Sequence, residues 1–166
     1  MYDIDLTTVT SRGNWYNFSW KGDIQKSGGV ATNIGIHFFD MLGWIFGGTI
    51  RNLVHLSKHN KAAGYLELER ARIRWFLSLD ENDLPEASKN KGQRAFRSIV
   101  IDGEEVEYSD GFTELHTSTY KEILAGRGFG LNDARQSVDI AYNIRNSKVS
   151  PLTGDYHPYL IKLKNV

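Results

Sequence analysis

The sequence predicts an α+β fold, in which a mainly antiparallel, open sheet carries helices packed on one of its faces. Alternating apolar and polar residues, which are typical of strands, cluster in the middle of the chain at 50–58, 64–68, 71–79 and 96–101. Segments with helical spacing lie nearer the two ends. Strands gathered in the middle with helices at the flanks favour a sheet covered by separate helices over an alternating βαβ pattern.

The N-terminal third is expected to hold one strand and one helix. Residues 2–10 alternate and are rich in threonine, so they are predicted to form a strand. Residues 11–27 mix glycine, aromatic and basic residues without a helical period, and we expect a long loop or irregular strand. The helix spans 28–46, because Gly28-Gly29 opens it and Gly47-Gly48 is a helix-stop signal.

The remaining elements follow from turn and capping residues. Asp102-Gly103 predicts a hairpin turn, after which a strand continues through 106–108. Leu115, Ile123 and Leu124 mark one apolar face of a helix over 113–125. Asn132-Asp133 is expected to cap a second helix. The other segments are expected to be a polar loop at 81–93 and an extended tail at 150–163.

Length and composition limit the function classes. A chain of 166 residues fits one domain over 1–166. A net charge of zero gives no general attraction to nucleic acid or to an anionic membrane. The longest apolar stretch, 30–46, is interrupted by Asn33, His37 and Asp40, so it is too short and too polar to span a bilayer. The chain has no cysteine, which excludes disulfides and thiolate chemistry and fits a reducing cytoplasm.

The helix over 28–46 carries the most informative polar pattern. Asn33, His37, Asp40 and Trp44 are spaced by four, three and four residues, which places them in one narrow stripe of the helix. We call these four residues the polar stripe. A broad neighbouring face is expected to be buried and consists of Ile34, Phe38, Met41, Leu42 and Ile45.

Two interpretations of the polar stripe remain open. An imidazole beside a carboxylate is a plausible acid–base pair or contact to a substrate hydroxyl. Alternatively, Asp40 simply holds His37 in the core by a hydrogen bond, and the stripe is the polar side that any helix needs. The spacing alone does not choose between a catalytic and a structural stripe.

The residues around this helix resemble a known family. The string GGVATNIGIHFFD at 28–40 is similar to the GGGxxxDxGxHxxD signature of the glucose–fructose oxidoreductase, inositol dehydrogenase and MocA family. The segment GRGFGLNDARQSVDIAYNIRNS at 126–147 is similar to its closing segment. Asn33 stands where the signature usually has Asp. That change, together with 11–48 and 112–130, looks closest to the UDP-N-acetylglucosaminuronate 3-dehydrogenases of lipopolysaccharide O-antigen synthesis.

The resemblance implies a fold and a reaction. The fold would be the C-terminal domain type of glyceraldehyde-3-phosphate dehydrogenase. Family members oxidise a sugar hydroxyl by giving hydride to NAD on a Rossmann domain, so a base must reach that hydroxyl. By resemblance His37 is its partner, Asp40 supports His37, and Asn33 binds substrate or cofactor. The family also uses a lysine from a Glu-Lys-Pro motif, and no such motif occurs in this sequence.

The dinucleotide site itself is expected to be absent from this chain. Such a site needs a strand, a GxGxxG turn and a helix. Gly126, Gly128 and Gly130 lie between two predicted helices, so they are expected to be turn glycines. The chain is therefore predicted to be a substrate-binding and oligomerising domain without its N-terminal Rossmann half, either excised or truncated. It is expected to bind no NAD alone and to be inactive alone.

Arg12, Trp15 and Tyr16 form a second candidate cluster for the substrate. An arginine fork can bind a diphosphate, and the aromatic rings can stack on uracil or on a sugar. The alternative is that Trp15, Phe18 and Trp20 form the inner face of a strand and Arg12 is a surface cation. The residues by themselves support both interpretations equally, and the family resemblance favours contact with the substrate.

The other histidines are assigned no chemistry. His55 and His59 would lie about 13 Å apart on a strand, too far to share an ion, so no metal is assigned. His157 is expected to be exposed in the tail. The charged run 67–74 alternates with apolar residues, which is typical of an open sheet face or of a homo-oligomeric contact through the sheet.

The sequence is compatible with three functions. The first is the substrate domain of an NAD-dependent UDP-sugar 3-dehydrogenase; the second is a domain acting on another polyol such as inositol. The third is a non-catalytic binding or assembly module.

Overall fold

A computed structural model describes residues 1–13, 15–107 and 114–164. The helices and strands follow one another as β1 (Tyr2–Thr10), α1 (Trp15–Phe18), α2 (Ile24–Ser27), η1 (Ala31–Gly35), α3 (Ile36–Phe46), β2 (Thr49–Ser57), β3 (Lys61–Leu68), β4 (Ala71–Ser78), η2 (Glu81–Asp83), α4 (Glu86–Asn90), β5 (Ala95–Ile101), β6 (Glu104–Glu107), α5 (Leu115–Leu124), α6 (Leu131–Asn146) and α7 (Tyr159–Lys164). No helix among these described residues is long and apolar enough to cross a membrane.

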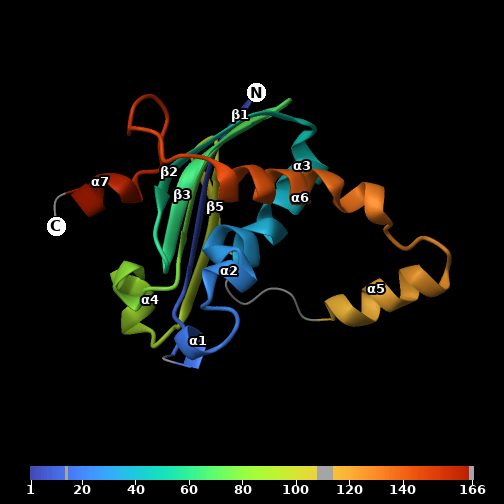
Figure 1. Cartoon of the computed structure of the whole chain (residues 1–166), viewed down its shortest axis with the longest axis horizontal. Helices are drawn as coiled ribbons and strands as arrows, with labels where there is room; N and C mark the ends of the chain where they lie inside the picture. Colours follow the sequence, from blue (N-terminus) through green and yellow to red (C-terminus); the bar gives the residue numbers. More distant parts are fainter. Residues whose placement is uncertain (14, 108–113, 165–166) are drawn as a thin grey trace.

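The six strands form one open sheet in the order β2-β3-β4-β1-β5-β6 (Figure 1). Only β1 and β4 run parallel; every other neighbouring pair is antiparallel. The Asp102-Gly103 turn joins β5 to β6, and both residues have the positive φ that a tight hairpin needs. The predicted α+β class and the mainly antiparallel, open sheet are confirmed.

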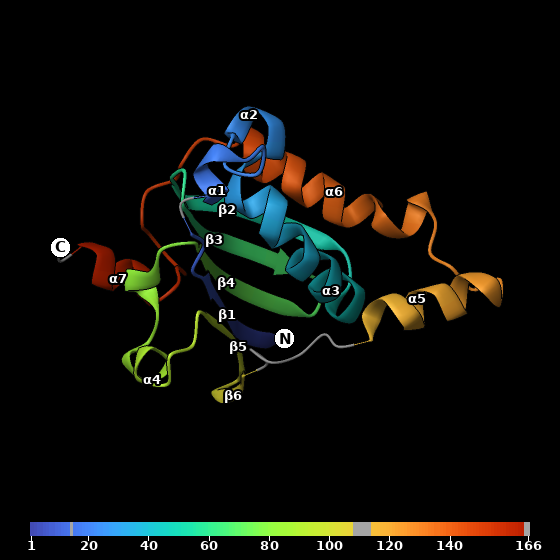
Figure 2. The same ribbon diagram turned by 90° about the horizontal axis from the view of Figure 1, so that it is seen from below.

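One face of the sheet is covered by α3 and α6, which lie side by side over it (Figure 2). Alternate residues of the central strands point to these helices and are fully buried, among them Leu6 of β1 and Trp75 of β4. Gly64 of β3 is required there, since a Cβ at this position would come within 2.5 Å of the Trp75 ring. The core therefore lies between the sheet and the helix pair, and it fixes α3 firmly.

Among the described residues, the opposite face of the sheet is covered at one end only. The C-terminal segment with α7 packs there in a second core of Val9, Ala63, Phe76, Leu84 and Leu160. The other end of this face carries charged residues in register. Arg74 of β4 pairs with Asp5 of β1, and Arg72 stands opposite Glu67 of β3.

Three segments differ from the prediction. Residues 11–27 hold two short helices: Asp23 caps α2 by accepting a hydrogen bond from the Gln25 amide, and Gly28 ends it at a φ of 76°. The predicted loop 81–93 holds η2 and α4, and the predicted extended tail holds α7. Each of these helices has at most six residues, too few to show a 3.6-residue period.

The start of α6 also differs from the prediction. The N-cap of α6 is Gly130, not Asn132-Asp133; Asp133 lies in the first turn, where its carboxylate accepts a hydrogen bond of 2.6 Å from the Gly130 amide. Tyr108 and Thr113, expected to end a strand and to begin a helix, lie outside the described residues.

Candidate functional site

The candidate site is built on the entry to α3. Gly28 and Gly29 have φ values of 76° and 82°, which a residue with a Cβ rarely adopts. The chain then makes a π-helical turn over Ala31–Gly35 before it continues as α3, and such turns are frequent at functional sites. Gly35 lets this turn approach the sheet, because a Cβ there would come within 2.8 Å of Leu77 and Phe39.

The polar stripe faces away from the core. Phe38, Phe39, Leu42 and Phe46 are buried against the sheet. His37, Asp40 and Trp44 are exposed, and Asn33 is half-buried. The alternative of a core histidine held by Asp40 is therefore wrong for this structure. Ile45, which we expected on the buried face, is exposed as well.

The structure joins two of the predicted site residues directly. The Asn33 side-chain amide donates a hydrogen bond of 3.0 Å to the hydroxyl oxygen of Tyr16. Tyr16 is buried, and its ring lies edge-to-face against the exposed ring of Trp15, with centroids 5.8 Å apart. This contact connects the N-terminal aromatic cluster with the polar stripe although 17 residues separate them.

The strand interpretation of the aromatic cluster is wrong. Trp15 and Phe18 belong to the short helix α1, and both are exposed together with Trp20. They form no inner face of a strand. Of the cluster only Tyr16 enters the core, so the others are available to a ligand or a partner.

A polar hollow of about 440 Å³ lies beside Arg12 and Tyr16. The lining residues that were not predicted include His59 and Asn60 from the turn between β2 and β3, and Arg94 from the entry to β5. The Ser11 amide donates to the Arg94 carbonyl, and this bond joins the backbone just after β1 to the backbone just before β5. Two guanidinium groups at one hollow can bind an anionic group such as a diphosphate.

Acidic residues at the rim of this hollow are held by a lysine. Lys61 forms salt bridges with Asp80 at 3.1 Å and Asp83 at 2.7 Å. Burial by itself lowers the pKa of Lys61, but the hydrogen bonds and charges of Asp83 and Asp80 outweigh it and raise the pKa above its usual value. Lys61 thus offsets part of the negative charge of Asp80 and Asp83, and Glu81 adds a further carboxylate to the lining that contains Arg12 and Arg94.

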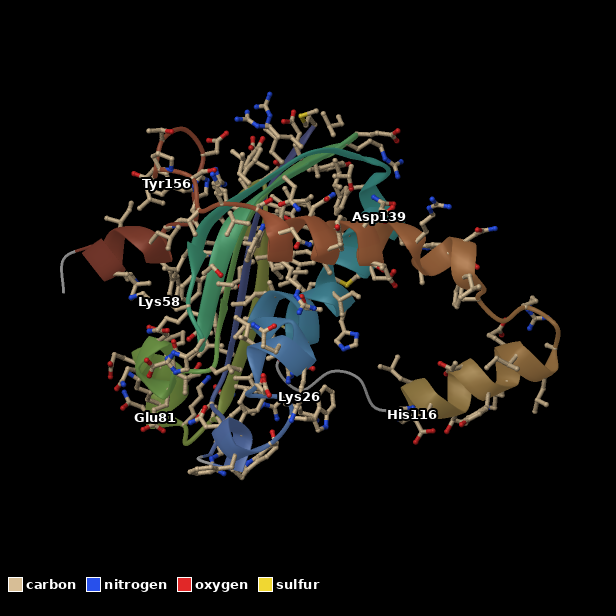
Figure 3. The ribbon with its side chains drawn as sticks, viewed as in Figure 1. Lys26, Lys58, Glu81, His116, Asp139 and Tyr156 are labelled. Carbon is tan, nitrogen blue, oxygen red and sulfur yellow. The ribbon has the colours of Figure 1, made fainter. Side chains whose placement is uncertain are left out.

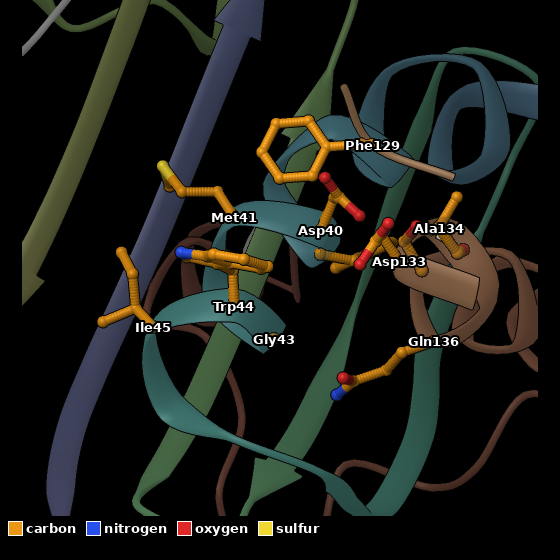
Figure 4. A pocket seen from close by; sticks show the side chains of 11 residues that line it. Asp40, Met41, Gly43, Trp44, Ile45, Phe129, Asp133, Ala134 and Gln136 are labelled. Carbon is orange, nitrogen blue, oxygen red and sulfur yellow. Dashed lines mark hydrogen bonds between the residues drawn. The ribbon is translucent and has the colours of Figure 1, made fainter. Parts of the chain in front are cut away.

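A second hollow, of about 480 Å³, lies at the other end of the polar stripe. Asp40 and Trp44 line it together with Phe129 and Asp133, which precede and begin α6 (Figure 4). The Trp44 and Phe129 rings meet edge-to-face with centroids 5.6 Å apart. Phe129 and Asp133 belong to the closing segment of the family resemblance but were not predicted as site residues. They lie near Asp40 only in the folded chain.

His157 is buried, so the prediction that it is exposed is wrong. The Tyr159 amide donates to its Nδ1 at 3.2 Å, and its Nε2 lies 3.1 Å from the Thr7 hydroxyl. Burial first, and then the positive charges of Arg74 and Lys162, lower the pKa of His157 to about 3. This histidine is a neutral structural group near neutral pH.

The glycine run at 126–130 connects two helices, as expected. Gly126 has a φ of 73° just after α5, and Gly130 precedes α6. No strand leads into the run, so it does not have the strand–turn–helix form of a dinucleotide site. Among the described residues, no group of three or more His, Cys, Asp or Glu side chains is placed to hold a metal ion.

Comparison with known proteins identifies relatives of this arrangement. The WlbA (WbpB) dehydrogenase from Thermus thermophilus, in complex with NAD and α-ketoglutarate, is 52% identical over 95% of this chain, with a TM-score of 0.91. The same enzyme in complex with NAD and UDP-GlcNAcA is 50% identical over 95% of the chain, again with a TM-score of 0.91. The WlbA dehydrogenase from Bordetella pertussis is 18% identical over 87%, with a TM-score of 0.61, and shares the fold.

The chain spans about half the length of these relatives, covering 52%, 51% and 53% of them. A family model described as "Oxidoreductase family, C-terminal alpha/beta domain" matches residues 1–122. The match includes all six strands, α3 and every predicted site residue. The chain therefore belongs to the glucose–fructose oxidoreductase, inositol dehydrogenase and MocA oxidoreductase family, as a C-terminal alpha/beta domain.

Proposed function

We propose that this chain is the substrate-binding half of an NAD-dependent dehydrogenase that oxidises a sugar hydroxyl, at C3 of UDP-N-acetylglucosaminuronate, for bacterial O-antigen synthesis in the cytoplasm. The observation that carries the proposal is the 50% identity, over 95% of this chain, to a dehydrogenase crystallised with NAD and UDP-GlcNAcA. Among the described residues, the glycine run 126–130 follows a helix and not a strand, so in this proposal NAD is held by a separate Rossmann half. Bound there, NAD accepts hydride.

His37 takes the proton of the reacting hydroxyl in this proposal. Oxidation of an alcohol needs a base within hydrogen-bond reach, and His37 is exposed on a helix whose other side is anchored in the core. A rigid element holds a reacting group in place better than a loop does. Asp40, three residues on and also exposed, supports a positive charge on the imidazole.

Asn33, Tyr16, Trp15 and Arg12 bind the substrate. The Tyr16 hydroxyl holds the Asn33 amide at 3.0 Å, so the amide oxygen of Asn33 remains available to a sugar N–H or hydroxyl. Arg12 lines the polar hollow with Arg94, which suits a diphosphate. The sugar would then lie at the polar stripe and the nucleotide toward the polar hollow.

The test is an activity assay on a fusion. The half of the Thermus thermophilus dehydrogenase that this chain does not match is placed before the chain, and NAD reduction is followed. We expect reduction with UDP-N-acetylglucosaminuronate, and loss of most of it in Arg12→Ala through a raised KM. Activity with inositol instead would assign the second function. Binding of UDP-sugars by calorimetry without any reduction would assign a binding module.

We also propose that the open end of the sheet joins two copies of the chain. The face away from α3 and α6 is covered only at one end, and its uncovered part carries Asp5, Glu67, Arg72 and Arg74 in alternating sign. Such a surface is complementary to itself about a twofold axis. Light scattering is expected to show a dimer that Arg72→Glu dissociates; a strict monomer at high concentration would count against it.

A further inference from the structure

Helix α5 is little covered by the rest of the described chain. None of its ten residues is buried, and it stands away from the sheet and the other helices (Figures 1 and 2). His116, near its start, lies well apart from the body of the domain (Figure 3). One side of the helix is nevertheless apolar and carries Leu115, Tyr120, Ile123 and Leu124, of which Leu124 is 86% exposed.

This helix lacks the usual sources of helical stability. Its N-cap, Glu114, has a φ of 65° and makes no side-chain capping hydrogen bond. Helices shorter than about 12 residues are marginal in water unless tertiary contacts support them. A contiguous apolar surface left in water marks a site of interaction. The apolar side of α5 is therefore suited to contact a protein surface beyond the described residues.

The apolar surface of α5 continues toward the polar stripe. Gly128 lies against Ile123, since a Cβ there would come within 3.0 Å of Ile123 Cγ1. The next residue, Phe129, is 74% exposed and contacts Trp44, which is 71% exposed. Trp44 ends the stripe that carries His37 and Asp40. Asp40 lines the same hollow as Trp44 and Phe129, so a partner that covers α5, Phe129 and Trp44 would also reach the polar stripe at Asp40, one helical turn from His37.

We propose that this surface, formed by Leu115, Tyr120, Ile123, Leu124, Phe129 and Trp44, docks the dinucleotide-binding half of the dehydrogenase. The inference rests on the proposed function, because hydride can reach NAD only if the half that holds NAD approaches the hydroxyl at His37. The Thermus thermophilus relatives carry NAD and are about twice as long as the matched part, which leaves one domain of similar size for this surface. A second copy of the chain is proposed to bind at a different surface, the open end of the sheet.

The proposal is tested by hydrogen exchange on the 166-residue chain. The probe is the unmatched half of the Thermus thermophilus dehydrogenase, first shown to be folded by its own binding of NAD. We expect the α5 amides to exchange fast in the chain alone and to slow by about tenfold or more when the probe is added, since a docked helix opens less often. Binding of the probe without protection of α5, or no binding of the folded probe, would overturn the proposal.

Matched variants separate docking from folding. Ile123→Glu with Leu124→Glu is expected to abolish binding of the probe and to leave the melting temperature unchanged, because both side chains are exposed. The control is Ile161→Glu on α7, where the side chain is 52% exposed, as is Ile123; it should bind as the parent does. Equal binding by the double variant would overturn the proposal, as would a dimer of the chain that the double variant dissociates.

The same samples distinguish this inference from the proposed function. NAD and UDP-N-acetylglucosaminuronate are added to the bound pair, and reduction is measured. Protection of α5 without any reduction would sustain the docking surface and contradict the substrate assignment. Reduction without protection of α5 would sustain the proposed function and contradict the docking surface.

Discussion

Two histidines occupy opposite regions of the molecule and differ in almost every respect. His37 is exposed on α3, on the side of the helix that faces away from the sheet. His157 is 2% exposed beneath the other face of the sheet, where both ring nitrogens have partners within the chain. A polar group whose partners all lie inside the fold serves the fold. A polar group presented outward by a rigidly anchored helix is available to a substrate.

Replacing His157 should produce the largest loss of stability. The ring packs against Phe76 and Tyr159, with centroids 5.7 and 5.5 Å away, and its Nε2–H donates to Thr7. His157→Ala would leave a cavity and an unpaired hydroxyl, and should cost about 2–4 kcal/mol, measured by urea unfolding. His37→Ala is the matched control and should change the free energy of unfolding by less than about 0.5 kcal/mol. Equal losses would remove the contrast between the two regions.

The pH dependence of stability should also report on His157. The pKa of His157 is about 3 in the folded chain, against an ordinary histidine value of 6.5. Below pH 6.5 the unfolded chain therefore binds a proton that the folded chain does not, and the free energy of unfolding falls as the pH drops toward 3. Between pH 7 and pH 5 the loss should be about 2 kcal/mol.

His157→Gln isolates this contribution. Glutamine does not titrate and keeps an N–H donor for Thr7, so the loss between pH 7 and pH 5 should shrink by most of that amount. Urea unfolding at the two pH values measures it. An unchanged pH dependence in the variant would show that His157 is not held neutral by burial.

A smaller effect is expected where the polar stripe meets the core. Tyr16→Phe removes the hydroxyl that holds the Asn33 amide and should cost about 1 kcal/mol of stability. In the active fusion it should raise KM for the sugar nucleotide more than it lowers kcat, because Asn33 is then less well positioned for binding. Steady-state kinetics checks this; a fall in kcat alone would contradict a role in substrate binding.

The features that the sequence predicted are those that depend on residues near one another along the chain. The strands and the stripe on α3 follow periods of two and 3.6 residues, and these periods persist over elements of eight residues or more. The short helices α1, α2 and α7 carry no such period. The burial of His157 depends on Thr7, 150 residues earlier, and a pattern within the tail does not contain that contact.

The candidate site could be assembled from the sequence in part for the same reason. Asn33 of η1 and His37 and Asp40 of α3 belong to one continuous helical segment, so spacing and family resemblance proposed them together as candidates. Arg94 reaches Arg12, and Phe129 reaches Trp44, only through the pairing of β1 with β5 and the packing of α6 on α3. Helical spacing also indicated the apolar residues of α5, and the structure leaves them exposed.

The central claim is that His37 serves chemistry and not folding, and one measurement tests it most directly. In the active fusion His37 is replaced by Asn, which keeps hydrogen bonding but cannot exchange a proton near neutral pH. Turnover of UDP-N-acetylglucosaminuronate should fall by about 10²–10⁴-fold, while the melting temperature stays that of the parent. A variant that melts several degrees lower yet oxidises the sugar at the parent rate would contradict the account.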